Sequence, residues 1–149
     1  MSLLIDLVNQ VASYQAIPPQ LLAASTQGSA LDMSNQEIAT GMIVDIGAIT
    51  VANVTSLQVQ AEECATTNGT WTVIPNMVVT VTATTTAANT HQVVRGLRTY
   101  RYARANCVTL AATTTTGAFP INVEIIAQNK FVNPSGDFGG YSNYPSSST

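Results

Sequence analysis

Four arginines, spaced three residues apart, are the side chains of this 149-residue sequence with the clearest capacity for chemistry. A guanidinium group can bind a carboxylate through two parallel hydrogen bonds, so these residues could anchor the chain to an acidic partner. Because tyrosines lie among them, they could also follow a nucleic-acid backbone through charge and base stacking. A third reading is that they pair with acids of their own chain and lie over the tyrosines. The residues concerned are Arg95, Arg98, Arg101, Arg104, Tyr100 and Tyr102.

The elements around the arginines limit how many of them can share one surface. Side chains of a strand alternate between its faces, so a spacing of three cannot place every arginine on the same face. We expect Arg95 and Arg98 on a turn into a strand over residues 99–108. Arg101 and Arg104 should then lie on opposite faces, unless the strand is bulged. The net charge of −3 and the single lysine argue against nucleic acid as a partner.

No set of residues suited to catalysis or metal binding can be recognised in the sequence. His91 is the only histidine, and Cys64 and Cys107 are the only thiols, which is too few for the four close ligands of structural zinc. Glu62 and Glu63 are interpreted as a solvated strand end. The sequence has neither a Gly-rich phosphate loop nor a Ser-elbow motif. We therefore expect no enzyme activity, no cofactor, no metal and no small-molecule substrate.

The cysteines bear on the compartment in which the protein is made. Residues 2–11 lack the basic start of a secretory signal, and Asp6 interrupts their apolar run. We therefore expect synthesis in a cytoplasm that keeps thiols reduced. Cys107 fits a small apolar position in a strand. A disulfide between Cys64 and Cys107 stays open as the less favoured alternative.

The sequence is unusually poor in charge. Only 9% of its residues are charged, against about 25% in soluble domains, while 46% are hydrophobic. Neutral surfaces repel one another little, so copies of such a protein tend to associate. We expect much of the surface to be covered by other chains. No apolar run approaches the roughly 18 residues of a membrane-spanning helix, so no membrane contact is expected.

Residues 1–24 are predicted to form a helical arm. Over residues 2–14, apolar side chains recur with the spacing of one helical face. The Ile17-Pro18-Pro19 sequence is expected to end this helix. Because so short a helix is only marginally stable by itself, it should dock either on its own domain or on a neighbouring subunit. The apolar residues are Leu3, Leu4, Leu7, Val8 and Val11.

Residues 25–131 are predicted to form an antiparallel β-sandwich of the jelly-roll or immunoglobulin-like kind. Apolar and polar residues alternate in about seven segments, as in strands with one buried face. Asn68-Gly69 predicts a hairpin turn, and Pro75-Asn76 is expected to separate two strands. Trp71, in phase with Val73, is expected at the centre of the core. The alternating segments include 40–46, 57–62, 70–74, 79–84 and 121–128.

Residues 132–149 are predicted to form an extended C-terminal tail. They are rich in Ser, Gly, Asn and Pro, and cannot bury enough apolar surface to order themselves. Phe138, Tyr141 and Tyr144 are spaced at three, as anchors on a partner surface would be. The alternative is that these aromatic residues are incidental.

Three stretches follow one another in a distinctive order. They are residues 44–50, residues 57–60 leading to residues 69–75, and residues 95–105. This order resembles small virion proteins of tailed bacteriophages, most closely the capsid cement (decoration) proteins of long-tailed phages. The likeness extends over about residues 29–130. The family usually has an Asp-Gly turn before the tryptophan, and Asn68-Gly69 stands in for it in this sequence.

The resemblance implies a structural protein of the virion, made in the host cytoplasm and located on the capsid surface. It implies binding to the outside of the major capsid protein shell and to copies of itself, as a dimer or trimer, so that capsomers are bridged. Two alternatives stay open: a tail-tube or head–tail completion protein, and a carbohydrate-binding sandwich with an aromatic platform. The candidate interface residues are Leu3, Leu7, Val11, Arg95, Arg98, Arg101, Arg104, Phe138, Tyr141 and Tyr144.

Overall fold

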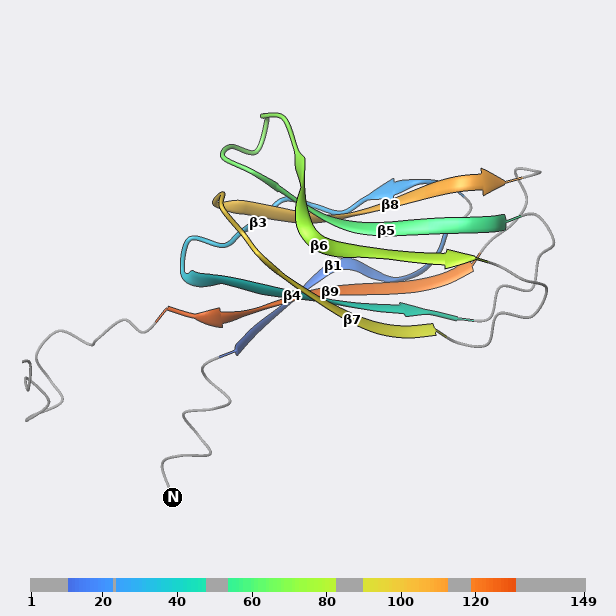
Figure 1. Cartoon of the computed structure of the whole chain (residues 1–149), viewed down its shortest axis with the longest axis horizontal. Helices are drawn as coiled ribbons and strands as arrows, with labels where there is room; N and C mark the ends of the chain where they lie inside the picture. The colour runs from blue at the N-terminus through green and yellow to red at the C-terminus, as the bar shows by residue number, and fades with distance from the viewer. Residues whose placement is uncertain (1–10, 23, 48–53, 83–89, 113–118, 131–149) are drawn as a thin grey trace, which may run out of the picture.

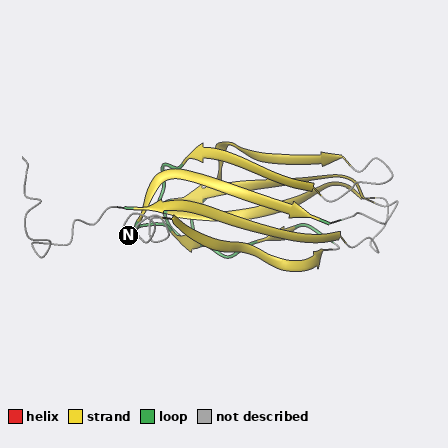
Figure 2. Cartoon of the chain, turned by 90° about the horizontal axis from the view of Figure 1, so that it is seen from below, coloured by secondary structure: helices red, strands yellow, loops and turns green. Residues whose placement is uncertain are grey.

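Two antiparallel β-sheets pack face to face in the computed structural model of the chain (Figures 1 and 2). The structure describes residues 11–22, 24–47, 54–82, 90–112 and 119–130. Within these ranges all regular structure is strand, and every strand pairing is antiparallel. The all-β sandwich expected from the alternating sequence pattern is confirmed.

The first sheet, which we call sheet A, has the strand order β1-β9-β4-β7. It consists of β1 (Val11–Leu22), β4 (Gln36–Ile46), β7 (Thr90–Leu97) and β9 (Phe119–Asn129). In its centre, β4 and β9 pair without interruption from Thr40 opposite Ala127 to Ile46 opposite Ile121. The two edge strands, β1 and β7, are far apart in the sequence.

The second sheet, sheet B, has the strand order β2-β8-β5-β6, and β3 also pairs with β8. It consists of β2 (Thr26–Gln27), β3 (Leu31–Asp32), β5 (Val54–Cys64), β6 (Thr72–Thr82) and β8 (Tyr102–Ala112). The expected hairpin around Asn68-Gly69 is confirmed, because residues 65–71 join the paired strands β5 and β6.

The core lies between the sheets and is built from one face of each long strand. The alternation expected for the four most regular segments is confirmed, since their apolar positions are buried. Full burial of each large aliphatic side chain is worth roughly 1.5–3 kcal/mol, which makes this interior the main stabilising element. The buried positions of these segments are Thr40, Met42, Val44, Ile46, Leu57, Val59, Ala61, Val79, Val81, Ile121, Val123, Ile125 and Ala127.

Glycines allow the two sheets to approach each other at both sides of the sandwich. A Cβ atom on Gly28, which follows β2, would lie 2.0 Å from the carbonyl oxygen of Ala16 in β1. A Cβ atom on Gly96 in β7 would lie 2.6 Å from the carbonyl oxygen of Pro75 in β6. Because backbone atoms cannot yield easily, any larger side chain at these positions would push the sheets apart.

The helix expected over residues 2–14 is wrong where the structure tests it. Residues 11–14 begin β1, which pairs with β9 from Val11 opposite Gln128 to Leu22 opposite Phe119. The sheet supplies backbone partners that a short isolated helix lacks, so pairing overrides the helical spacing. Residues 11–22 of the expected arm are therefore part of the sandwich, and residues 1–10 lie outside the described residues.

The prolines expected to end a helix lie instead in an edge strand. The register of β1 against β9 shifts between Ile17 and Gln20, which is where Pro18 and Pro19 stand. Proline cannot donate a backbone hydrogen bond, so it is tolerated at a bulge on the edge of a sheet.

A bulge in β6 explains why the expected position of Trp71 is wrong. β6 runs without a break through Pro75-Asn76, but its pairing with β5 jumps from Val78 opposite Gln60 to Val73 opposite Glu62. Asn76 adopts a φ of 65° there, and Figure 1 shows β6 turning sharply. The bulge reverses the alternation, so Ile74 is buried while Val73 is exposed. Trp71 accordingly lies half-buried against the outer face of sheet B and not at the core centre.

Candidate interaction surface

Arg98 is a buried arginine that closes one end of the sandwich. Its guanidinium donates to five backbone carbonyl oxygens, one of them just before β4 and two of them on the first residues of β4. Burial lowers the pKa of Arg98, and the charges of Glu63 and Asp32 oppose that shift. Its side chain is used inside the fold, which leaves little of it exposed for the interface role expected from the sequence. The acceptors are the carbonyl oxygens of Met33, Gln36, Glu37, Tyr100 and Arg101.

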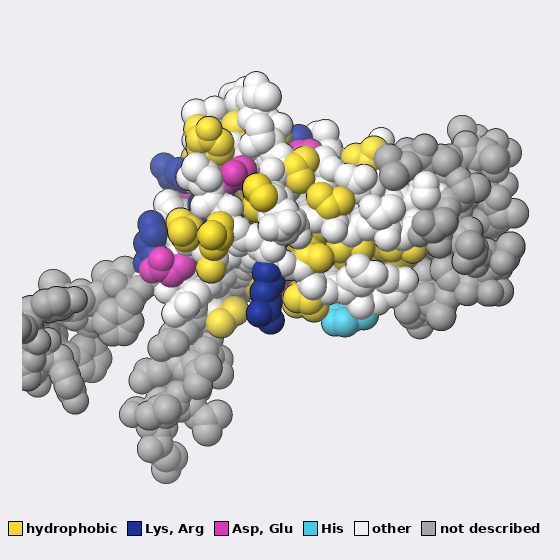
Figure 3. Space-filling view, viewed as in Figure 1, with side chains coloured by type: hydrophobic (Ala, Val, Ile, Leu, Met, Phe, Trp, Pro, Cys, Tyr) yellow, Lys and Arg dark blue, Asp and Glu magenta, His cyan; other side chains and the backbone are white. Residues whose placement is uncertain are grey.

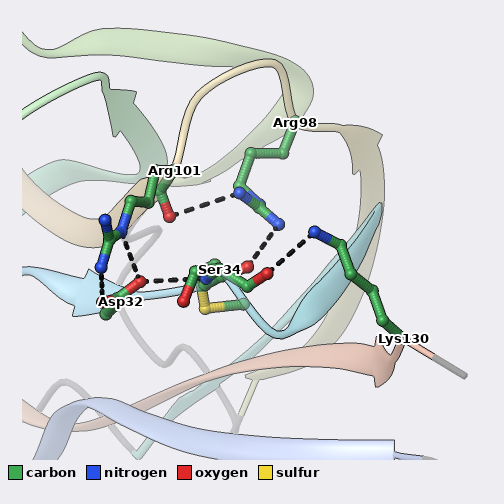
Figure 4. A network of polar contacts seen from close by, with 6 residues as sticks. Asp32, Ser34, Arg98, Arg101 and Lys130 are labelled. Atoms are coloured by element: carbon green, nitrogen blue, oxygen red, sulfur yellow. Dashed lines mark hydrogen bonds and ion pairs between the residues drawn. The ribbon is translucent and has the colours of Figure 1, made fainter. Parts of the chain in front are cut away.

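Arg101 forms a two-point ion pair with Asp32 at the same end of the molecule (Figure 4). The Arg101 Nε atom lies 2.9 Å from Asp32 Oδ1, and Nη2 lies 2.5 Å from Oδ2. The hydrogen bond from Arg101, together with one from the Ser34 amide, holds the pKa of Asp32 well below its usual range. Lys130 donates from Nζ to the Ser34 carbonyl oxygen at 2.8 Å, which attaches the end of β9 to the same segment.

Glu63 and Glu62 are both buried, so the expectation of a solvated acidic strand end is wrong. The Glu63 carboxylate accepts hydrogen bonds from the backbone amides of Thr99 and Tyr100, at 2.5 and 2.8 Å. It thereby fixes the turn that carries Arg98. A buried carboxylate needs such donors, because an unpaired charge in this position would be very costly.

Glu62 is the centre of a polar ladder on the outer face of sheet B. Its Oε2 atom accepts from Arg104 Nε at 2.8 Å, and Oε1 accepts from Asn106 Nδ2 at 2.8 Å and from Gln60 Nε2 at 2.7 Å. Gln60 in turn accepts from Gln58 Nε2 at 2.8 Å. Burial raises the pKa of Glu62, but these hydrogen bonds lower it by more, so the net shift is downward.

Trp71 contacts this ladder through a cation–π interaction with Arg104. The guanidinium of Arg104 lies 4.3 Å from the centre of the Trp71 ring. Arg101 makes a similar but longer contact with Tyr102, at 5.2 Å. The interpretation that arginines pair with acids of their own chain is confirmed for Arg101 and Arg104. Contact with a tyrosine, the other part of that interpretation, is confirmed for Arg101, whereas Arg104 lies over Trp71. Arg104, only 16% exposed, has little surface left for a partner.

The outer face of sheet A presents a hollow with a very different lining. It is an open groove of about 650 Å³ at the end of the sheet where β1 begins. Gly41 forms part of the floor, and the Ile126 side chain lies so close that a Cβ on Gly41 would be 2.8 Å from it. Three aliphatic side chains in the lining are substantially exposed: Val11 at 52%, Val93 at 48% and Leu97 at 65%. Figure 3, in which the two sheets are seen from their edge, shows hydrophobic side chains on either side of a cationic one near the lower margin of the described part.

Arg95 is the charged residue of this groove. It is exposed on β7 beside Val93 and Leu97, on the same face. Among the described residues it makes no hydrogen bond and no ion pair, in contrast to the other three arginines. A positive charge surrounded by aliphatic groups is a feature that a partner with one acid among apolar residues would complement.

The remaining chemically distinctive side chains are accounted for within the fold. His91 is an exposed residue near the start of β7, and its Nδ1 atom lies 2.5 Å from Asp45 Oδ1. Cys64 and Cys107 are buried and not bonded to each other, and burial raises the pKa of the Cys107 thiol to about 11. The part of the chain that the structure describes holds no group of three acidic, histidine or cysteine side chains able to bind a metal ion. Nor does it contain a helix of the length and apolarity needed to cross a membrane.

Of the candidate interface residues, the structure brings two together. Val11 and Arg95 line the same groove, although they lie on opposite edge strands of sheet A. Arg98 and Arg104 are committed to internal contacts, and Arg101 is exposed but paired with Asp32. The other candidates, Leu3, Leu7, Phe138, Tyr141 and Tyr144, lie outside the described residues, as does the whole of the expected tail over 132–149.

Sequence reasoning missed most of the groove. Val93, Leu97 and Ile126 were not singled out, although the sequence carries a signal for one of them. Ile126 occupies a polar phase of its strand, between Glu124 and Gln128, and an isoleucine in an outward phase indicates an apolar patch on that face.

Comparison with known proteins adds no identification at this point. No protein-family model matches the chain, and no curated protein is similar to it.

Proposed function

We propose that this chain is a structural virion protein that binds the outer surface of a bacteriophage capsid shell and stabilises it by bridging capsomers. The observation that carries the proposal is the apolar groove on the outer face of sheet A, with Arg95 unpaired among the described residues. An apolar centre with an arginine is the composition of a protein–protein contact. The major capsid protein and further copies of this chain are the partners that the sequence resemblance favours.

The strand order supports a viral setting. The strand orders β1-β9-β4-β7 and β2-β8-β5-β6, with β3 as a fifth strand beside β8, resemble the two interleaved sheets of a jelly roll. Jelly rolls occur in viral capsid proteins and in lectins. Since one fold serves many functions, this is an argument from analogy, and the groove carries the greater weight.

A shallow groove is sufficient for a cement protein. Its contact with any one neighbour can be weak, because many copies on a repeating lattice bind with high combined avidity. The low content of charged residues, 9%, also favours close contact between neighbouring chains.

The direct experiment uses purified shells stripped of this protein. Such shells should stay closed but lose resistance to heat and to low salt, and adding the protein back should restore it. Equal resistance with and without the protein would rule out a cementing role. The number of copies per particle separates the proposal from the tail-tube or head–tail completion alternative, which requires a small or tail-proportional count.

The carbohydrate-binding alternative depends on an accessible aromatic platform. Arg104 stacks on Trp71 and Arg101 approaches Tyr102, so both of these rings already have a guanidinium partner. Quenching of tryptophan fluorescence by sugars would revive this alternative.

A further inference from the structure

The groove of sheet A specifies the chemistry of what can fill it. Its lining is aliphatic along Val11, Val93, Leu97 and Ile126, and it carries one positive charge, Arg95, without a partner among the described residues. A complementary segment therefore needs several aliphatic side chains and one acid. A polar or strongly charged segment would leave the aliphatic lining in contact with water.

The first ten residues of this chain have that composition. Residues 1–10, Met-Ser-Leu-Leu-Ile-Asp-Leu-Val-Asn-Gln, contain five aliphatic side chains around a single acid. The acid is Asp6, and no other residue of the segment is charged at neutral pH apart from a free amino terminus, if one is present. The segment thus supplies one carboxylate for Arg95 and an apolar surface for the groove.

The position of Val11 places this segment next to the groove. Val11 lines the groove and is also the first residue of β1. Ten extended residues span at most about 33 Å. The four strands of sheet A lie about 4.8 Å apart, so the face is only about 14 Å from edge to edge. Residues 1–10 are therefore long enough to reach across the groove of a neighbouring copy of the chain.

The direction of β1 favours the groove of a second copy. β1 enters sheet A at the end where Val11 lies level with Gln128, and where Ala39 pairs with Leu97. The groove is at this same end. To cover the groove of its own chain, the preceding segment must reverse direction immediately before Val11. A two-fold related copy facing this end could receive the segment without such a reversal, and would return its own segment into the first groove.

We propose that the groove on sheet A receives residues 1–10 of a second copy of this chain, so that two copies exchange N-terminal segments. The exchange rests on the proposed function in one respect only, namely that the outer face of sheet A is an interface. It goes further by naming the segment that fills the groove. Asp6 of one copy pairs with Arg95 of the other, while the aliphatic side chains around Asp6 lie against Val93, Leu97 and Ile126.

Engineered disulfides test the exchange in the full-length protein. One preparation carries Leu3→Cys and a size tag, and the other carries Leu97→Cys without a tag. After mixing and mild oxidation, the exchange predicts a disulfide-linked heterodimer on a non-reducing gel. Unsubstituted protein is the background control, since its two cysteines are buried and should not crosslink.

A doubly substituted chain separates exchange from folding back. If Leu3→Cys and Leu97→Cys in one diluted chain form an internal disulfide while the mixed preparations give no heterodimer, the segment covers its own groove and the proposal is overturned. Absence of both products also overturns it.

Charge reversal gives a second, independent readout. Arg95→Glu should weaken self-association about two- to fivefold, as expected for an exposed ion pair, and the Asp6→Lys/Arg95→Glu double variant should restore it. The matched control is Val78→Asp on the outer face of sheet B, which should leave self-association unchanged. Failure of the double variant to recover any affinity counts against the pairing. These results do not depend on shells, so the proposed function can fail while the exchange stands, or the reverse.

Discussion

On the outer face of sheet B the polar side chains bind one another, whereas on the outer face of sheet A the groove leaves aliphatic groups and a guanidinium open. Glu62 alone engages Gln60, Arg104 and Asn106. Arg95, on the other sheet, has no such partner among the described residues. Arginines that look equivalent in the sequence therefore differ in one respect: some already bind an acceptor within the fold, and Arg95 does not bind one among the described residues.

The difference follows from where acids are available. Glu62 lies opposite Arg104 in the pairing of β5 with β8, so this acid and Arg104 come together by register. Arg95 pairs across β7 and β4 with Gly41, which has no side chain at all. Arg95, on the edge strand β7, therefore faces no side chain that could pair with its charge, and the guanidinium is available to another molecule. On this basis we assign the interface to sheet A.

The largest effect should come from the arginine inside the fold. Arg98→Met should lower the free energy of unfolding by about 3–5 kcal/mol, because buried carbonyl oxygens lose their donor and Glu63 loses a nearby positive charge. Chemical denaturation measures it. The matched control, Arg101→Met, removes an exposed ion pair and should change stability little. Equal losses for the two variants would contradict the distinction between internal and external arginines.

The next effect separates the two outer faces by their contribution to binding. Val93 and Val78 are exposed valines on edge strands of sheets A and B, at 48% and 38%. Val93→Asp should weaken binding to stripped shells about tenfold, equivalent to about 1.4 kcal/mol, since it places a carboxylate against an apolar partner. Val78→Asp should bind as the unsubstituted protein does. A larger loss for Val78→Asp, measured by cosedimentation with shells, would place the interface on sheet B.

Substitutions in the bulge that turns Trp71 to the outer face should change the free energy of unfolding by a smaller amount. Asn76 has a φ of 65°, a conformation that asparagine and glycine tolerate better than alanine. Asn76→Ala should cost about 1 kcal/mol of stability, whereas Asn76→Gly should cost less. Thermal unfolding of both variants measures the difference. Equal costs would mean that strain at Asn76 does not hold the bulge.

Acid should weaken the polar ladder of sheet B by the smallest amount. The pKa of Glu62 is lowered from its ordinary value of 4.5 in the folded state. Its stabilising effect is therefore complete above pH 4.5 and is lost as pH falls through the lower, folded-state pKa. The difference in unfolding free energy between the unsubstituted protein and Glu62→Gln should shrink as pH falls below that value. A difference that grows in acid would contradict the downward shift.

The sandwich and much of its core could be predicted because strands β4, β5 and β9 keep a strict period of two. Alternation failed where a bulge inserts extra residues into a strand, and the helical spacing failed where a strand pairs with a distant part of the chain. The bulge near Asn76 reversed the faces of Trp71 and Val73, and nothing in a period-two pattern announces such a shift. For residues 11–14 the helical spacing was real, but the partner strand β9 lies more than a hundred residues away.

The candidate site could be predicted only in part, because the role of each arginine depends on its neighbours in space. Arg98 and Arg95 have the same chemistry and are three residues apart, yet one meets five carbonyl oxygens and the other a glycine-floored groove. The sequence shows the cluster, but strand register decides which member remains free for a partner.

The central claim is that the outer face of sheet A, and not that of sheet B, becomes buried when the protein assembles. Carbene footprinting with mass spectrometry can compare the protein diluted to its monomeric state, in which the groove is empty, with the shell-bound protein, residue by residue. The account predicts strong protection of Val93 and Leu97 on the shell, with labelling of Val78 unchanged. Full labelling of Val93 and Leu97 on the shell would contradict it.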